Sequence, residues 1–534
     1  MIWRVRTFRR LIGRAETPLD LEFSVVAQRR PFDLVARNFA SLQERFSSSR
    51  GLREYDQLVI APEKNVGTAE RRHGTLSISS DEPFFTLFRS ETGQRAPYSS
   101  VIVDVQSFAD AGGEQDAVFA GLVKDESNYL VAWFSHASGA VGIDAVVDGD
   151  LATLVALDTP IDAPCRVAFS LTGNIVAALL DPGDGFRPLV HARLPDNVDL
   201  RRPAVLEDYR NAFGARASSG AIVLDSVEAG YFGQTGLRDP HVVTDADGAP
   251  YIKYGKVFLT MTQAGLGFFE TAHCGVWTLD LADHRLEQVA HLFFQRDDTD
   301  AVFGDHACHL VRDERNDRWI VATSTWGDFT GDGVEVHYAT VPTSTDLLHD
   351  VHVLRTERLP LPVDELTTPA AGQWDPHLVR IRDRWYVGFV NAREFFDFYP
   401  ALACSEAGAD FTELSLVAAD TTKNETEGFV IQRMGGTWYV FASNGDRSAP
   451  HMRDQFPVYD LSLTQIGALN APHPTNIPWP MVFPVPQSGG RTRWLMVTFE
   501  GTAYQREMLG YGTHGNVVVM EAKPITRGHE FPTD

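Results

Sequence analysis

Three acidic residues, Asp239, Asp375 and Glu427, each stand at the head of a short apolar stretch in the C-terminal half of the chain. Carboxyl groups held close together cannot all ionise freely, and partial burial raises a carboxyl pKa further. One such group can stay protonated near neutral pH while another remains a base. That division of roles is what cleavage of a glycosidic bond requires.

The three acids belong to a pattern that recurs five times. Apolar first strands are predicted to start at Asp239, Ala307, Asp375, Glu427 and Trp479, at intervals of 68, 68, 52 and 52 residues. A turn and a second strand follow each of them, with an aromatic residue near the start of that strand: Tyr251, Trp319, Trp385, Trp438 and Trp494. Five units of roughly 50–70 residues, each with room for four strands, predict a five-bladed β-propeller over residues 233–534. The aligned starts should then form a ring at one mouth of the central channel.

The acidic trio on these units resembles that of the furanosidase superfamily of five-bladed propeller glycoside hydrolases. The resemblance is greatest to family 43, with families 32, 62 and 68 as relatives. Thr426-Glu427-Gly428-Phe429 is similar to the acid motif of family 43, and Asp239-Pro240 is similar to its base motif. The resemblance, which covers about residues 236–525, implies that Asp239 is the general base and Glu427 the general acid. It also implies that Asp375 orients the sugar and keeps the pKa of Glu427 raised.

The position of one tripeptide favours family 43 over its relatives. Arg-Asp-Pro, which families 32 and 68 carry on blade three, occurs here on blade one as Arg238-Asp239-Pro240, whereas blade three has Trp374-Asp375-Pro376. The resemblance therefore implies an exo-acting, inverting hydrolase of furanosides or related pentosides such as arabinofuranosides. Two alternatives stay open: a retaining fructosidase or transglycosylase, in which Asp239 is a nucleophile, and a propeller that binds carbohydrate without catalysis.

Other side chains are expected at the same mouth, because a second strand returns to the end where the first strand began. Trp326 and Trp374 have the flat apolar faces on which a sugar can stack. Arg393 and Asn444 are candidates for binding hydroxyl groups, and Asp305 is a candidate substrate contact. These five residues complete the predicted substrate-binding set.

Histidines raise the question of a metal. His241, His309 and His377 take the same place in three units, which favours a packing role over metal binding. The predicted chemistry needs no cofactor. Related enzymes often hold a calcium ion in the channel, and the resemblance implies His514 as the position to examine for a structural calcium.

The N-terminal part has a different pattern. Residues 1–70 read as a mixed extension, with a short amphipathic helix predicted over 32–46. Residues 71–232 contain many short alternating stretches, which predict a β-sandwich of the jelly-roll kind. The fragment Tyr129–Phe134, followed by Gly139 and Gly142, resembles the middle of a concanavalin-like sandwich. An accessory carbohydrate-binding module and a purely structural domain are both compatible with this pattern.

Composition limits the partners. The 534 residues carry 71 acidic and 47 basic side chains, a net charge of −24, which disfavours nucleic acid and anionic membranes and suits a neutral oligosaccharide or glycoside. The four cysteines form no CxxC pair. Neither a signal-peptide apolar segment nor a membrane-length apolar stretch is present, so a cytoplasmic location is expected. The oligomeric state stays open.

Overall fold

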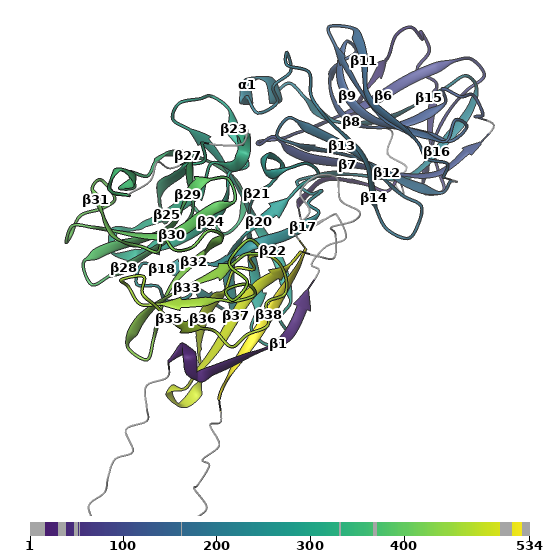
Figure 1. The fold of residues 1–534 in the computed structure, drawn as a ribbon. Coiled ribbons are helices and arrows are strands. Elements are labelled where there is room, and N and C mark those ends of the chain that lie inside the picture. The colour runs from purple at the N-terminus through teal and green to yellow at the C-terminus, as the bar shows by residue number, and fades with distance from the viewer. Residues whose placement is uncertain are drawn as a thin grey trace, which may run out of the picture.

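The computed structural model describes residues 17–29, 39–46, 52, 54–109, 111–161, 163–329, 333–366, 371–501 and 515–525. Within these ranges the chain is almost entirely β-structure, which confirms the all-β prediction. The exceptions are one short helix, α1 (Pro203–Leu206), and isolated turns of 3-10 helix. No helix in the described ranges is long and apolar enough to cross a membrane. Figure 1 shows two bodies of sheet, the N-terminal one in blue and the C-terminal one from teal to yellow.

The N-terminal body consists of two antiparallel sheets that pack on one core. The first runs through β11 (Asp150–Asp158), β10 (Ala140–Val147), β9 (Asn128–Ser135), β8 (Ala117–Asp125), β15 (Arg210–Ala217), β6 (Phe84–Gly93) and β3 (Tyr55–Val59). The second runs through β14 (Arg187–Arg193), β13 (Ile175–Asp181), β12 (Cys165–Thr172), β7 (Tyr98–Ala109), β16 (Gly220–Gly230), β5 (Thr75–Ser80) and β4 (Thr68–Arg72). Phe88 and Phe134 of the first sheet meet Phe169 and Leu224 of the second in this core. Alternate residues of each strand point inward, as the sequence pattern predicts.

The predicted helix over residues 32–46 is wrong where the structure describes it. Ala40–Glu44 is strand β2, which pairs antiparallel with β16. Its side chains alternate between more and less exposed positions, the period of a strand. The edge of β16 offers backbone hydrogen bonds to this segment, and that tertiary pairing overrides the helical spacing of its apolar residues. Residues 30–38 lie outside the described residues.

The C-terminal body contains five antiparallel four-stranded units. Unit 1 has β17 (Gly236–Val242), β20 (Lys256–Ala264), β21 (His273–Asp280) and β22 (Leu286–Arg296), and unit 2 has β24 (His306–Asp313), β25 (Arg318–Ser324), β26 (Val336–Pro342) and β27 (Asp350–Arg358). Unit 3 has β28 (Gly372–Ile381), β29 (Arg384–Glu394), β30 (Asp397–Ser405) and β31 (Leu414–Ala419), and unit 4 has β32 (Thr426–Met434), β33 (Thr437–Asn444), β34 (Pro457–Tyr459) and β35 (Gln465–Ala468). Unit 5 combines β36 (Met481–Pro486), β37 (Thr492–Glu500) and β38 (Asn516–Pro524) with the N-terminal β1 (Leu21–Arg29).

The first strands of the five units contact one another in a closed circle, β17 to β24, β28, β32, β36 and back to β17. Each predicted start is therefore brought to a common centre. The predicted aromatic residue near the start of each second strand is observed in units 2 to 5. These residues are Trp319 in β25, Trp385 in β29, Trp438 in β33 and Trp494 in β37. In unit 1 the prediction that Tyr251 lies near the start of the second strand is wrong. Tyr251 lies between the short strands β18 (Thr244–Asp245) and β19 (Ile252–Lys253), and β20 is the second strand.

Strand β1 closes the C-terminal body, although 450 residues of sequence separate it from the rest of unit 5. It pairs antiparallel with β38 from Leu21 opposite Pro524 to Arg29 opposite Val517. Leu21 and Phe23 are buried in the core of the C-terminal body. The expected extension of residues 1–70 is thus divided between the two bodies, since β1 joins the C-terminal one and β2 to β4 join the N-terminal sheets.

A buried chain of polar side chains joins the two bodies. Tyr98 of β7 donates a hydrogen bond to Gln234 Oε1 (2.6 Å), whose amide nitrogen donates to Gln288 Oε1 (3.1 Å). Gln288 in turn reaches His291 of β22. All four side chains are buried, so this contact orders the N-terminal body against unit 1.

The pairing of β1 with β38 leads to a stability prediction. Phe23→Ala should destabilise the C-terminal body by about 3–5 kcal/mol, because it removes a large buried ring from the core. Val25→Ala, on the same strand at a half-exposed position, is the matched control and should change stability by less than about 0.5 kcal/mol. Denaturant unfolding followed by tryptophan fluorescence tests this. Equal midpoints for both variants and the unmodified protein would show that β1 does not hold the unit together.

Candidate active site

Four of the first strands carry the same irregularity where they approach the centre. Each of these strands has one extra residue relative to the second strand with which it pairs, which is a β-bulge. The bulges lie between Arg238 and His241, His306 and His309, Trp374 and His377, and Glu427 and Val430. The second residue of each bulge has a positive φ: Asp239 (50°), Ala307 (57°), Asp375 (56°) and Gly428 (73°). Bulges of this kind turn side chains away from the regular alternation of a strand. Here they direct the residues at the strand starts into one cavity.

This register corrects the alignment made from the sequence. The residue equivalent to Asp239 and Asp375 is Gly428, and Glu427 takes the position of Arg238, His306 and Trp374. A side chain on residue 428 would place its Cβ 2.6 Å from Trp479 Cδ1, and its φ of 73° suits glycine. Glu427 nevertheless lines the same cavity as the two aspartates.

The cavity encloses about 180 Å³. Its polar side chains come mainly from the first-strand bulges, and its aromatic ones mainly from loops outside them. The lining residues are Arg238, Asp239, Phe268, Phe269, His306, Ala307, Trp326, Trp374, Asp375, Phe395, Phe396, Phe398, Glu427, Asn476, Ile477 and Trp479. The structure thus brings all three predicted catalytic acids and both predicted tryptophans into one small space.

A single guanidinium group bridges two of the acids. Arg238 Nε donates to Asp239 Oδ1 at 2.7 Å, and Arg238 Nη2 lies 3.6 Å from Glu427 Oε1. The other oxygen of Glu427, Oε2, accepts a hydrogen bond from Trp374 Nε1 at 3.2 Å. Sequence reasoning noted Arg238 only as part of a tripeptide, and it missed the role of the side chain in pairing these acids.

The surroundings separate the acids in pKa. Burial and the negative charge of Asp239 raise the pKa of Glu427 to about 7, against the opposing effect of Arg238. Burial, with the charges of Glu427 and Asp239, raises the pKa of Asp375 well above its ordinary value. Asp375 Oδ2 is buried and forms no hydrogen bond within the chain. These surroundings favour the protonated form of Asp375, and Asp239 is the acid that has the shortest ion pair with Arg238.

The resemblance implied that Asp375 keeps the pKa of Glu427 raised. The two carboxyl groups line one cavity, and the charge of Glu427 contributes to the raised pKa of Asp375. The raised pKa of Glu427 comes from burial and from Asp239. What Asp375 presents to the cavity is a carboxyl group with an unused oxygen.

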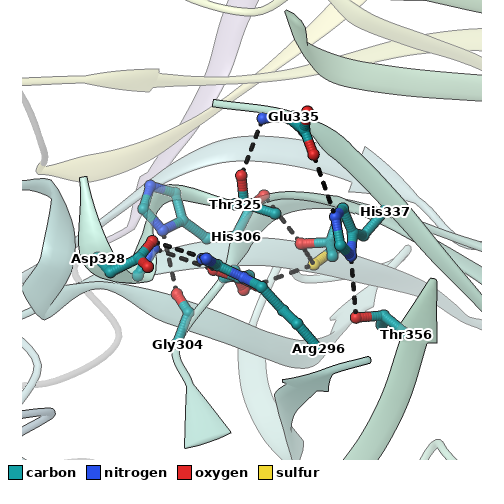
Figure 2. A network of polar contacts seen from close by, with 12 residues as sticks. Arg296, Gly304, His306, Thr325, Asp328, Glu335, His337 and Thr356 are labelled. Carbon is teal, nitrogen blue, oxygen red and sulfur yellow. Dashed lines mark hydrogen bonds and ion pairs between the residues drawn. The ribbon is translucent and has the colours of Figure 1, made fainter. Parts of the chain in front are cut away.

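Asp305 does not line the cavity, contrary to the prediction. It is fully buried beside the second bulge and forms two hydrogen bonds with Arg296, from Nε (3.0 Å) and Nη2 (2.7 Å). It also accepts a hydrogen bond from the backbone N–H of Gly327 (2.9 Å), and Arg296 pairs in addition with Asp328. Figure 2 shows Arg296 at the centre of this network, between Asp328 and the strand that carries His337. Asp305 supports the turn at Trp326 rather than binding a ligand.

His306 connects this network to the cavity, and sequence reasoning missed it. Its Nδ1 contacts the carbonyl oxygen of Gly304 at 3.2 Å, and a carbonyl can only accept, so Nδ1 carries the proton (Figure 2). Burial lowers the pKa of His306 to about 3, so the ring is neutral at physiological pH. Its Nε2 is left as a hydrogen-bond acceptor at the cavity wall.

Two further predicted contacts lie outside the cavity. Arg393 uses its terminal nitrogens on Asp397 (2.6 Å) and on the backbone oxygens of Thr421 and Lys423, and it covers the ring of Tyr399. Asn444 is buried, accepts a hydrogen bond from Thr426 Oγ1 (2.7 Å) and donates to Met452 O (2.7 Å). Both residues hold loops around Glu427. Neither residue lines the cavity, and both have polar partners within the chain, so substrate binding by them stays a prediction without support from this geometry.

The histidine trio lies on the axis as a packed cluster. The rings of His309 and His377 stack at 4.3 Å, and His241 lies 5.0 and 5.3 Å from them. Burial lowers the pKa of His241 to about 4, so it is uncharged near neutral pH. Within the described residues no group of three His, Cys, Asp or Glu side chains could hold a metal ion. His514 lies outside them.

The aromatic residues of the cavity were the main omission of the sequence analysis. Apart from Trp326 and Trp374, it did not identify Phe268, Phe269, Phe395 or Phe396 as site residues. They sit in connections that have no strand periodicity. The only available signal was the pairing of aromatic residues in adjacent positions, Phe268-Phe269 and Phe395-Phe396.

Comparisons with known proteins place limits on what can be concluded by similarity. No family model and no curated protein matches the chain. Among solved structures, a doubly substituted Bacillus subtilis levansucrase in complex with oligosaccharides is similar at 10% identity and a TM-score of 0.40, over 54% of this chain and 86% of that one. A carbohydrate-binding module from Bacillus subtilis is similar at 15% identity and a TM-score of 0.25, over 33% of this chain and 97% of that one. Scores this low carry no conclusion about the chemistry of the site.

The raised pKa of Glu427 predicts a pH-dependent stability difference. Because the pKa rises from an ordinary 4.5 to about 7 on folding, the protonated form is favoured in the folded state. Its stabilising contribution is complete below pH 4.5 and is lost as the pH rises to about 7, a change of about 3 kcal/mol. The free energy of unfolding of Glu427→Gln, relative to that of the unmodified protein, should therefore increase by that order as the pH rises from 4.5 to 7. Parallel melting curves across this range would refute the assignment.

Proposed function

We propose that the chain is a glycoside hydrolase built from an N-terminal β-sandwich and a five-bladed β-propeller whose centre holds the active site. The closed circle of five first strands supports the propeller, and the two packed N-terminal sheets support the sandwich. The likeness to a levansucrase and to a carbohydrate-binding module is compatible with both assignments, but it does not carry them.

One observation carries the proposed chemistry: two carboxyl groups line one cavity, and Arg238 pairs closely with one of them, Asp239, and more distantly with the other, Glu427. Glu427, with a pKa of about 7, holds a proton below neutral pH, while Asp239 accepts a hydrogen bond of 2.7 Å from Arg238 Nε. A general acid and a general base in such proximity are the two groups that hydrolysis of a glycosidic bond requires.

In the proposed mechanism Glu427 donates its proton to the departing glycosidic oxygen. Asp239 takes a proton from the water that attacks the anomeric carbon from the opposite face, which gives inversion. Arg238 pairs with Asp239 and, by its longer contact with Glu427, stabilises the carboxylate that remains on Glu427 after proton transfer. Protonated Asp375 donates a hydrogen bond to a sugar hydroxyl, and the rings of Trp326 and Trp374 pack against the sugar face.

The proposed substrates are furanosides or related pentosides, with arabinofuranosides as the first choice. A cavity of about 180 Å³ is close in size to the 150 Å³ cavity that admits one benzene ring, so it encloses a single sugar. Enclosure of one sugar favours exo action on the end of a glycoside.

A retaining fructosidase or transglycosylase remains the second candidate. The 2.7 Å ion pair with Arg238 positions the carboxylate of Asp239, which suits a nucleophile as well as a base. A carbohydrate-binding propeller without catalysis is the third candidate, and only measured turnover excludes it.

Substitution of the acid and the base tests the proposal. On a panel of para-nitrophenyl furanosides and pentosides, Asp239→Asn and Glu427→Gln should each lower kcat/KM by about 10²–10⁴-fold, since each removes one proton-transfer group. Asp247→Asn, at an exposed turn of unit 1, is the matched control and should leave kcat/KM within about twofold. Binding of these sugars without turnover by the unmodified protein would contradict the proposal.

Proton NMR of the first-formed anomer separates the two enzymatic candidates. The proposed mechanism predicts that the product initially has the anomeric configuration opposite to that of the substrate. A first product of the same configuration would replace the base role of Asp239 with a nucleophilic one.

A further inference from the structure

The cavity has two chemically distinct parts. Its polar groups gather at the first-strand bulges, whereas half of its sixteen lining residues are aromatic. Six aromatic residues form a continuous surface from that cavity to its rim, which we name the aromatic wall: Phe268, Phe269, Trp326, Phe329, Phe395 and Phe396. Successive ring centroids lie 4.1–5.5 Å apart, from Phe268 to Phe269 (4.2 Å), Phe329 (5.5 Å), Phe395 (5.1 Å) and Phe396 (4.1 Å), with Trp326 4.8 Å from Phe269.

Two members of the aromatic wall are open to solvent. Phe268 is 43% exposed and Phe396 is 38% exposed, although both line the cavity. Exposed phenylalanine pairs at the edge of a cavity gain free energy when an apolar surface covers them. Phenylalanine rings can stack on the apolar face of a sugar, but they supply none of the hydrogen bonds that its hydroxyl groups need.

The backbone at Phe396 points to a ligand rather than to the turn itself. Glu394 pairs with Asp397 across the hairpin between β29 and β30, so Phe395 and Phe396 are its two loop residues. Such loops favour asparagine or glycine, and Phe396 has a φ of 70°, where a bulky residue is strained. The ring of Phe396 also packs against the guanidinium group of Arg447, 4.1 Å from the ring centroid. A strained residue that lines a cavity is a candidate for ligand binding.

We propose that the aromatic wall is a leaving-group subsite for an uncharged aromatic aglycone, so that the substrate is an aryl or arylalkyl glycoside. This proposal rests on the proposed function, because a leaving group exists only if a glycosidic bond is cleaved. Binding of an aromatic ring to the subsite does not depend on turnover. The sugar fills the space next to Asp239, Asp375 and Glu427, and the aglycone leaves through the mouth between Phe268 and Phe396. An oligosaccharide would place its second sugar on this apolar surface without polar partners from the wall.

A probe without a sugar tests the subsite separately from catalysis. Binding of para-fluorobenzyl alcohol is measured by fluorine NMR titration. The unmodified protein should bind it, and the variant Phe268→Ala/Phe396→Gly should bind at least fivefold more weakly. The control variant Leu151→Ala removes an exposed apolar side chain from β11 in the N-terminal body. It should bind the probe as tightly as the unmodified protein does.

Thermal melting distinguishes a binding role from a structural one. Phe396→Gly relieves the positive φ of the hairpin and should leave Tm unchanged or raise it, even as binding is lost. If Phe396 served only the fold, its replacement would lower Tm instead. The proposal is overturned if the unmodified protein does not bind the probe, or if the double variant binds it within twofold of the unmodified protein.

Kinetics then connect the subsite to the reaction. If arabinofuranosides are turned over, benzyl arabinofuranoside should have a kcat/KM about tenfold above that of methyl arabinofuranoside, and the double variant should remove this difference. Absence of turnover on all glycosides, together with probe binding, would reject the proposed hydrolase and keep the subsite. Equal kcat/KM values for the two glycosides would reject the aglycone assignment and keep the hydrolase.

Discussion

One guanidinium group faces three carboxyl groups in a closed cavity, and the charge balance between them governs the site. Three ionised acids beside Arg238 would leave a net negative charge in a space from which water is largely excluded, which is costly. Burial and these charges raise the pKa of Asp375 well above its ordinary value and the pKa of Glu427 to about 7, and protonation of these groups lowers that cost. Arg238 then pairs with Asp239. The division into acid and base follows from this balance.

The rest of the C-terminal body holds these groups in place. The αL residues in four bulges turn the strand starts inward, and two of the bulge positions, Asp239 and Asp375, are themselves acids. Asp305 with Arg296 supports the turn that carries Trp326, and Asn444 holds Thr426 next to Glu427. Strand β1 completes unit 5 as its outer strand, and contacts between β36 and β17 close the circle of first strands. Residues far from the cavity in sequence therefore determine its geometry.

The sequence predicted correctly the features that recur along the chain at a regular spacing. The apolar strands and the acids at their heads recur at regular spacing, so the five units and the trio Asp239, Asp375 and Glu427 were recognisable. Even there the alignment misplaced Glu427 by one residue, because a bulge is not visible in the pattern.

The predictions that the structure does not support have a common physical cause. Asp305, Arg393 and Asn444 were each placed correctly near the end of a strand, but their partners come from other segments, and a sequence pattern does not reveal that a polar group is already paired. The helix expected over 32–46 failed in the same way, since the edge of β16 is a distant partner. Phe268 and Phe396 were missed because connecting loops have no period to read.

The pH dependence of kcat/KM tests the central claim most directly, since it reports the protonation of the free enzyme. On an uncharged aryl furanoside, activity should fall tenfold per pH unit above about pH 7, as Glu427 loses its proton. The asparagine variant of Asp239, which lacks the charge that raises this pKa, should show the same limb at lower pH on its residual activity. Activity that stays constant from pH 6 to pH 9, or a limb that does not move in that variant, would contradict the assignment of Glu427 as the acid.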